Sequence, residues 1–180
     1  MVASRPTLPS GPMAASERRL VVGIGEFIVT DQPGDVIVTH ALGSCIAVCV
    51  WDPYHRVAGM LHFLLPESRI NLQRAADRPA TFADTGIPLL FQAAYRLGAE
   101  KARCRVRLVG GADVRADAAP GTSSFKIGRR NLLAAKNVLW RNGVLIDTEE
   151  VGGRAVRTVH LWAADGRLQV TSGGDAPVDL

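Results

Sequence analysis

Two side chains in the first half of the sequence carry the groups needed for nucleophilic acyl chemistry. Cys45 follows the glycine-containing turn at residues 42–44 and stands at the mouth of an apolar run, and His62 lies on the next apolar run. A thiol and an imidazole on neighbouring elements are the minimum parts of a nucleophile with its general base. A lone cysteine in an apolar stretch is more often a small buried hydrophobe, so a structural role for both residues remains the alternative.

A hairpin must position this pair. Residues 46–51 and 57–65 read as two strands, and the Asp-Pro sequence within residues 52–56 is typical of a turn. Both strands are almost continuously apolar, which indicates a sheet covered on both faces. Position 45 should face roughly position 63. A change of one residue in this register would move Cys45 and His62 from the same face to opposite faces, so the sequence allows their contact without fixing it.

Helical and extended patterns alternate irregularly along the rest of the chain. Apolar spacing predicts helices over residues 81–97 and 127–140, and residues 67–80 read as a long polar loop. Further strands are expected at residues 20–29, 36–39, 102–109, 144–151, 158–162 and 168–171, with the last two forming a hairpin. In the 102–109 strand the side chains of Arg103, Arg105 and Arg107 share one face. Hairpins dominate, so the predicted class is α+β, with mostly antiparallel sheets and two long helices on one side.

Composition bounds the organisation of the chain. Its 180 residues, 47% hydrophobic and 21% charged, suit one globular domain, expected at 19–172 between a disordered N-terminal tail (1–18) and a C-terminal tail (173–180). No apolar run approaches the roughly 18 to 20 residues of a membrane span, and no secretory signal is present. Three cysteines, an odd number, argue against a disulfide framework and favour the cytoplasm. The net charge of +4 is mild, and no nucleic-acid motif accompanies it.

The other cysteines and histidines are weaker candidates. Cys49 and Cys104 lie within strands and are interpreted as structural, while His40 and His55 fall in turns and His160 points outward from a strand. Zinc ligation by Cys45, Cys49 and His62 is disfavoured because strand residues four apart are separated by about 13 Å. The glycine pairs at 110–111 and 152–153 match no phosphate-binding fingerprint and are interpreted as turns. No metal or cofactor is expected.

The order of these features resembles the CheD family of bacterial chemoreceptor glutamine deamidases. The resemblance extends over about residues 20–172 and is carried by LGSCIAVCVWDP (42–53) and AGMLHFLLP (58–66). Supporting segments are FAD (82–84), VGGA (109–112), IGRRN (127–131) and GG (152–153) before Arg157. One departure is Val156, where the family often has glycine, and the small-residue loop at 112–124 is unusual.

The resemblance implies a layered α/β/β sandwich with a papain-like catalytic arrangement. It places Cys45 on the family's nucleophile, His62 on its base and Thr39 on the third residue, which orients the histidine. The backbone N–H of Cys45, with Gly43 and the Ser44 hydroxyl of the turn, is hypothesised to stabilise the oxyanion. The implied reaction converts protein glutamine to glutamate through a thioester, and the same groups would hydrolyse a glutamyl methyl ester.

The resemblance also implies partners. The substrate would be the cytoplasmic helical bundle of a chemoreceptor, and a CheC-type phosphatase would be a second partner. The competing interpretation is a regulatory binding module that docks on either protein without turnover. Retention of Thr39, Cys45 and His62 favours the enzyme, because an adaptor has no need of them.

Overall fold

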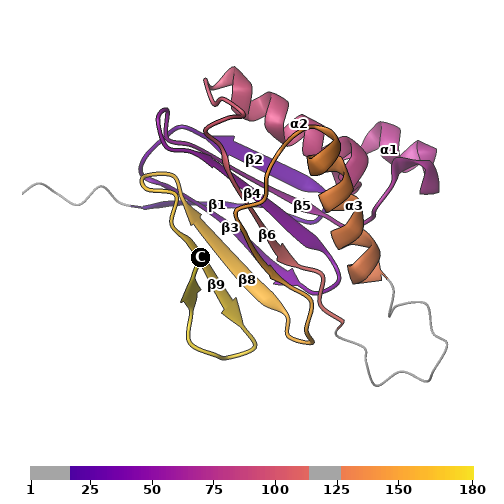
Figure 1. Cartoon of the computed structure of the whole chain (residues 1–180). Helices are drawn as coiled ribbons and strands as arrows, with labels where there is room; N and C mark the ends of the chain where they lie inside the picture. The colour runs from indigo at the N-terminus through magenta and orange to yellow at the C-terminus, as the bar shows by residue number, and fades with distance from the viewer. Residues whose placement is uncertain (1–16, 114–126) are drawn as a thin grey trace, which may run out of the picture.

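The computed structural model of the chain describes residues 17–113 and 127–180. Ten strands form two five-stranded sheets in this part of the chain, with two long helices on one side (Figure 1). The strands are β1 (Arg18–Val21), β2 (Glu26–Thr30), β3 (Asp35–Leu42), β4 (Ile46–Asp52), β5 (Val57–Phe63), β6 (Arg105–Gly110), β7 (Thr148–Val151), β8 (Arg157–Trp162), β9 (Leu168–Ser172) and β10 (Val178–Asp179). The helices are α1 (Leu72–Asp77), α2 (Ala83–Arg96) and α3 (Ile127–Arg141), and 3-10 turns lie at Ser68–Ile70 and Pro79–Thr81.

One sheet, here called the central sheet, has the order β2-β5-β4-β6-β7. Every residue of β4 and β5 is buried, as their continuous hydrophobicity predicts. Alternate side chains of β4 point to opposite layers. Ile46, Val48 and Val50 pack toward α2 and α3. Ala47 and Cys49 face the other sheet, as does Cys45 immediately before the strand. The central sheet is therefore the middle layer of the fold.

The second sheet, here called the outer sheet, has the order β1-β3-β8-β9-β10. Six of the eight strand pairings in the two sheets are antiparallel, and the pairs β1–β3 and β6–β7 are parallel. The layers thus run helices, central sheet, outer sheet (Figure 1). This arrangement confirms the predicted α/β/β sandwich with mostly antiparallel sheets and two long helices.

The two long helices follow their predicted patterns. The buried face of α2 includes Ile87, Leu90 and Phe91, and Pro88 falls early enough in the helix to be accommodated. The first turn of α3 packs against the backbone of Gly111. This contact requires glycine at position 128, because a Cβ there would lie 2.6 Å from the Gly111 carbonyl oxygen. No helix in the described ranges is long and apolar enough to cross a membrane.

The predicted strand at 20–29 is wrong, because the chain changes sheets in its middle. β1 pairs with β3 in the outer sheet, while β2 pairs with β5 in the central sheet. Between them, Gly25 adopts a φ of 75°, which suits the change of direction that glycine allows. The two glycines of this run lie where the chain crosses from the outer sheet to the central sheet.

Three other expectations also need correction. The stretch 67–80 is not a plain loop but contains α1, the whole 3-10 turn at Ser68–Ile70 and part of the one at Pro79–Thr81. The C-terminal tail is not frayed throughout, since β10 pairs with β9 and Leu180 packs on the inter-sheet core. Arg107 does not lie on a polar face: it is 6% exposed between the two sheets, and its Nη1 donates to the Gly166 carbonyl at 2.7 Å. The alternation was predicted, but not the buried carbonyl that accepts this hydrogen bond.

The predicted N-terminal tail and the 112–124 loop fall mainly outside the described residues. Residue 17 is the first of the described residues, and Arg18 already belongs to β1. Of the 112–124 loop, residues 112 and 113 are described. Gly110, Gly111, Gly152 and Gly153 all have positive φ values. Gly110 is nevertheless the last paired residue of β6, whereas the other three lie outside the strands.

Candidate active site

The side chains of Thr39 and His62 meet between the two sheets. Thr39 lies on the inner face of β3 in the outer sheet, and His62 lies on the inner face of β5 in the central sheet. The Thr39 Oγ1 and His62 Nδ1 atoms are 2.8 Å apart, and the two residues are 0% and 1% exposed. A hydrogen bond in this buried layer fixes the orientation of the imidazole ring.

The crossover after β1 decides which nitrogen of His62 carries the proton. Thr39 Oγ1 lies 2.8 Å from the carbonyl oxygen of Val22, which can only accept a hydrogen bond. The single hydroxyl proton of Thr39 is therefore used on Val22, and the hydroxyl must accept from Nδ1–H of His62. Nε2 is then the unprotonated nitrogen of the neutral ring, and it is buried without a hydrogen-bond partner in the described part of the chain. This is the tautomer in which Nε2 can act as a base.

Cys45 shares the inner face of the central sheet with His62. In the register of β4 and β5, Ala47 lies opposite His62, so Cys45 stands two positions before that pair, on the same side. The expected pairing of 45 with 63 is off by one residue, because the hairpin turn pairs Asp52 with Val57. The observed register is the one that brings the thiol and the imidazole to the same face. No hydrogen bond joins Nε2 to the thiol directly.

Burial keeps both groups neutral at rest. Desolvation lowers the pKa of His62 to about 4 and raises the pKa of the Cys45 thiol above its ordinary value. The polar backbone N–H of Cys45 opposes this rise, because it favours the thiolate. The Cys45 side chain remains 6% exposed, so the thiol lies at the edge of the core. Proton transfer from the thiol would therefore accompany bond formation rather than precede it.

The turn that carries Cys45 is fixed by hydrogen bonds to its carbonyl groups. Gly43 O accepts from Ala112 N and Cys45 O accepts from Gly111 N, each at 2.7 Å. Gly110 tolerates no side chain, because a Cβ there would lie 2.3 Å from Cys45 O. The N–H of Gly43 donates to Ala41 O at 3.0 Å and is therefore occupied within the turn. The hypothesised oxyanion role of Gly43 therefore has no support from its own N–H.

Asn131 is a site residue that the sequence analysis did not single out as functional. Its side chain is 0% exposed on α3, and Nδ2 donates to Ser44 O at 2.9 Å and to Leu64 O at 2.8 Å. A sequence signal for Asn131 was its polar side chain on the buried face of α3, where the other buried residues are small or apolar. The role of the Val22 carbonyl could not be predicted from the sequence, because every residue has a backbone carbonyl.

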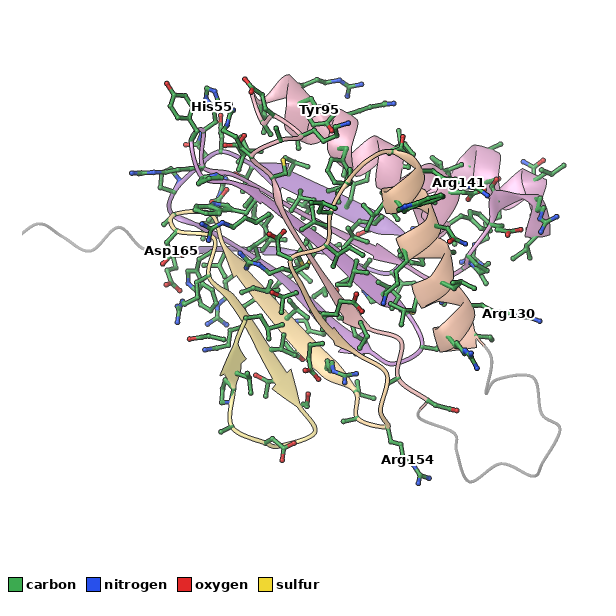
Figure 2. The ribbon with its side chains drawn as sticks, viewed as in Figure 1. His55, Tyr95, Arg130, Arg141, Arg154 and Asp165 are labelled. Carbon is green, nitrogen blue, oxygen red and sulfur yellow. The ribbon has the colours of Figure 1, made fainter. Side chains whose placement is uncertain are left out.

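The other candidate residues lie away from this group. His55 projects from the tip of the β4–β5 hairpin (Figure 2). His40 is exposed within β3 rather than in a turn, and His160 is half-buried on the opposite face of the outer sheet from the core. Cys49 is fully buried, and its pKa rises to about 12. Within residues 17–113 and 127–180, no three acidic, histidine or cysteine side chains gather as metal ligands would.

The buried neutral His62 predicts a stability that falls in mild acid. Its pKa is 6.5 when unfolded and about 4 when folded, so between these values the unfolded chain binds the extra proton. Its contribution is complete above pH 6.5 and decreases as the pH falls to 4, by about 3 kcal/mol. Urea unfolding at pH 7, 5.5 and 4.5 should show a larger decrease in the wild type than in His62→Gln, which still contains His160, another histidine whose pKa is lowered by burial.

The carboxylates do not obscure this measurement. The Arg18 guanidinium holds the pKa of Asp35 below its ordinary value, so that group loses its contribution only at more acid pH. Equal losses of unfolding free energy in wild type and His62→Gln between pH 7 and 4.5 would contradict the buried neutral imidazole.

Comparison with known proteins identifies relatives for most of the chain. The family described as "CheD chemotactic sensory transduction" matches residues 64–172. The chain is 44% identical over 155 residues to "Probable chemoreceptor glutamine deamidase CheD 1" of Syntrophus aciditrophicus, covering 86% of this chain and 94% of the relative. It is 48% identical over 154 residues to "Probable chemoreceptor glutamine deamidase CheD 2" of Anaeromyxobacter dehalogenans, with the same coverage of both chains.

Among solved structures, the Bacillus licheniformis hypothetical protein YfiH aligns with a TM-score of 0.43 at 13% identity. The alignment covers 78% of this chain and 61% of that protein. A similarity at this level supports no argument about the site.

Proposed function

Because this chain belongs to the CheD family, we propose that it hydrolyses the side-chain amide of glutamine residues on chemoreceptors to glutamate. The observation that carries the proposal is the inter-sheet group of Thr39, His62 and Cys45, in which Nε2 of His62 is left as the free base. The names of two relatives state this activity, and this chain aligns with 94% of the length of each. The activity would be that of a protein-glutamine glutaminase.

The proposed reaction begins with attack of the Cys45 sulfur on the glutamine amide carbon. His62 Nε2 takes the thiol proton as the C–S bond forms, and the amide π electrons move to the oxygen. When the tetrahedral intermediate collapses, the C–N bond breaks and the imidazolium of His62 gives its proton to the leaving nitrogen. Ammonia departs and a thioester remains on Cys45.

Water then completes the cycle. His62 takes a proton from water as the water oxygen attacks the thioester carbon. When the C–S bond breaks, the imidazolium gives this proton to the departing sulfur, which releases glutamate and restores the thiol and the neutral His62. Thr39 holds Nδ1–H throughout, so that the same nitrogen serves as base and acid in both halves. The Cys45 N–H and the Ser44 hydroxyl would stabilise the oxyanion. Catalytic hydrogen bonds are often long without substrate, which is consistent with the missing contact between thiol and Nε2.

We also propose that a protein surface, rather than a free amino acid, is the substrate. A groove of about 560 Å³ runs between the segment after β5 and α3, and its lining includes Arg130, Ile70, Leu133 and the ion pair of Arg69 with Glu67. Arg130 extends outward from α3 (Figure 2). Arginine beside exposed apolar side chains suits an acidic helical bundle, in keeping with the net charge of +4.

The cellular setting follows from the same proposal. Chemoreceptor glutamines of this kind would be met in the cytoplasm, and a CheC-type phosphatase is proposed as a second partner from family membership. The same acyl chemistry would hydrolyse a glutamyl methyl ester, because both reactions pass through one thioester. None of these steps needs a metal or a cofactor.

The test is direct. A purified cytoplasmic fragment of a chemoreceptor is incubated with the protein, and peptide mass spectrometry maps glutamine-to-glutamate conversion at individual sites. Conversion at defined glutamines, with matching release of ammonia, is the expected result, and a sample without the protein corrects for spontaneous deamidation. Measurable binding without conversion would replace the enzyme with the non-catalytic docking module.

A further inference from the structure

The side chain of Asn131 joins the two segments that carry the thiol and the imidazole. Its Nδ2 donates both of its protons, one to Ser44 O at 2.9 Å and one to Leu64 O at 2.8 Å. Because both partners are carbonyl oxygens, the amide orientation is settled: the nitrogen faces them and Oδ1 faces away. Ser44 immediately precedes Cys45, and Leu64 follows His62 by two residues.

We propose that Asn131 is a positioning residue for the acyl chemistry of Cys45. It holds the Ser44–Cys45 peptide so that the N–H of Cys45 faces the oxygen of the reacting carbonyl, and it fixes that peptide relative to the strand of His62. This inference rests on the proposed deamidase function, and it adds a residue that the catalytic group itself does not contain.

The orientation follows from peptide geometry. In a planar trans peptide the C=O and the N–H point in opposite directions. The C=O of Ser44 is directed at Asn131 on α3, so the N–H of Cys45 points away from the helix, into the layer that holds the thiol. The backbone N–H of Cys45 also lowers the pKa of its own thiol, which agrees with that direction. A donor placed there lies beside the atom that attacks, where an oxyanion forms.

The neighbouring peptide units are held in the same way. Gly43 O accepts from Ala112 N and Cys45 O accepts from Gly111 N. Three consecutive carbonyl groups of the turn, those of residues 43, 44 and 45, are therefore all engaged, and only the middle one is held by a side chain. The Ser44–Cys45 peptide is thus the unit whose orientation one substitution can release.

Helix α3 is seated closely enough to transmit this restraint. Gly128 packs directly on the Gly111 backbone, which leaves no room for a side chain between the helix and the turn. The Oδ1 atom of Asn131 is buried without a partner in the described residues, an arrangement that stability alone does not favour. An amide at this position is explained by its two donors, because no apolar residue could satisfy both carbonyls.

The experiment compares Asn131→Asp and Asn131→Ala with Trp51→Phe. Aspartate keeps the shape of asparagine but replaces its two donors with acceptors. Trp51→Phe is the matched control, because it removes another buried N–H to carbonyl bond, Nε1 to Ala163 O at 3.1 Å, at the opposite end of β4. Urea unfolding reports the stability of each variant, and activity is measured under conditions where each is folded.

Both Asn131 variants should lower kcat on the receptor fragment by about 10²-fold with KM unchanged, the size of effect that a misplacement of about 1 Å produces. The pH profile of Cys45 alkylation by iodoacetamide should move to higher pH, because its N–H no longer stabilises the thiolate. Trp51→Phe should lose stability but keep both the kcat and the alkylation profile of the wild type.

Equal kcat in the Asn131 variants and Trp51→Phe would overturn the inference, and so would a lower kcat with an unmoved alkylation profile, which indicates a structural role. If the wild type fails to deamidate the receptor fragment, the proposed function fails separately. The alkylation profile then decides the role of Asn131 by itself: a shift supports it and no shift overturns it.

Discussion

Replacing Cys45 by alanine is expected to abolish glutamine deamidation. Removing the nucleophile of a comparable acyl-transfer enzyme lowers kcat by about 10⁶-fold, and we expect a loss of at least about 10⁴-fold here. Receptor binding should persist, because Cys45 is 6% exposed and contributes little surface. The measurement is site-resolved conversion of glutamine to glutamate on the receptor fragment, together with the affinity of the fragment.

Cys49→Ala is the matched control for this substitution. Cys49 lies on β4, four residues after Cys45, and faces the same layer, but burial raises the pKa of its thiol to about 12. Each variant removes one sulfur atom from the inter-sheet core, so the two should have similar effects on packing. A difference in activity between them would therefore reflect the chemical role of Cys45. Conversion that survives in Cys45→Ala, or that is lost equally in Cys49→Ala, would show that Cys45 is not the nucleophile.

Replacing Thr39 by valine is expected to give the second largest loss. Valine has the shape of threonine without its hydroxyl, so Nδ1 of His62 loses its acceptor and the fixed tautomer is released. In a serine protease, a change that inverts the tautomer of the base lowers kcat by about 10⁴-fold, and we expect about 10²- to 10⁴-fold here. The nitrogen chemical shifts of His62 should report Nδ1–H in the wild type and a mixture of tautomers in the variant.

Thr39→Ser separates the hydroxyl from the packing. Serine keeps the hydrogen bonds to Val22 O and His62 Nδ1 and loses only a methyl group. It should therefore retain most of the kcat and the wild-type nitrogen shifts. Similar losses of kcat in Thr39→Val and Thr39→Ser would assign Thr39 to packing rather than to orientation of the imidazole.

The sequence was most informative where local rules decide the structure. The hairpin after Asp52 was predictable because Asp-Pro favours a turn, and the structure shows the Asp52 carboxylate accepting from Tyr54 N at 2.8 Å. The periodicity of residues 83–96 was sufficient to predict α2. Sheet order was less accessible: the glycines between β1 and β2 look the same locally whether a strand bulges or leaves its sheet.

The site was predictable to a different extent for each residue. The pairing of Cys45 with His62 depended on one residue of register, which the turn settles by placing Asp52 opposite Val57. Thr39 entered through the family resemblance, because nothing in its local sequence indicates a hydrogen bond across two sheets. Asn131 is separated from Ser44 and Leu64 by 87 and 67 residues in the sequence. Hydrophobic periodicity reports only on local structure, so it could not predict these contacts.

The contact between Thr39 and His62 also makes the orientation of the imidazole depend on how the two sheets pack against each other. Each residue belongs to a different sheet, and the two sheets are held together by side-chain packing rather than by a shared hydrogen-bond ladder. Sliding one layer over the other would leave every strand intact and still separate the hydroxyl from the imidazole. The orientation of the base therefore depends on the relative position of the two sheets as well as on the strands themselves.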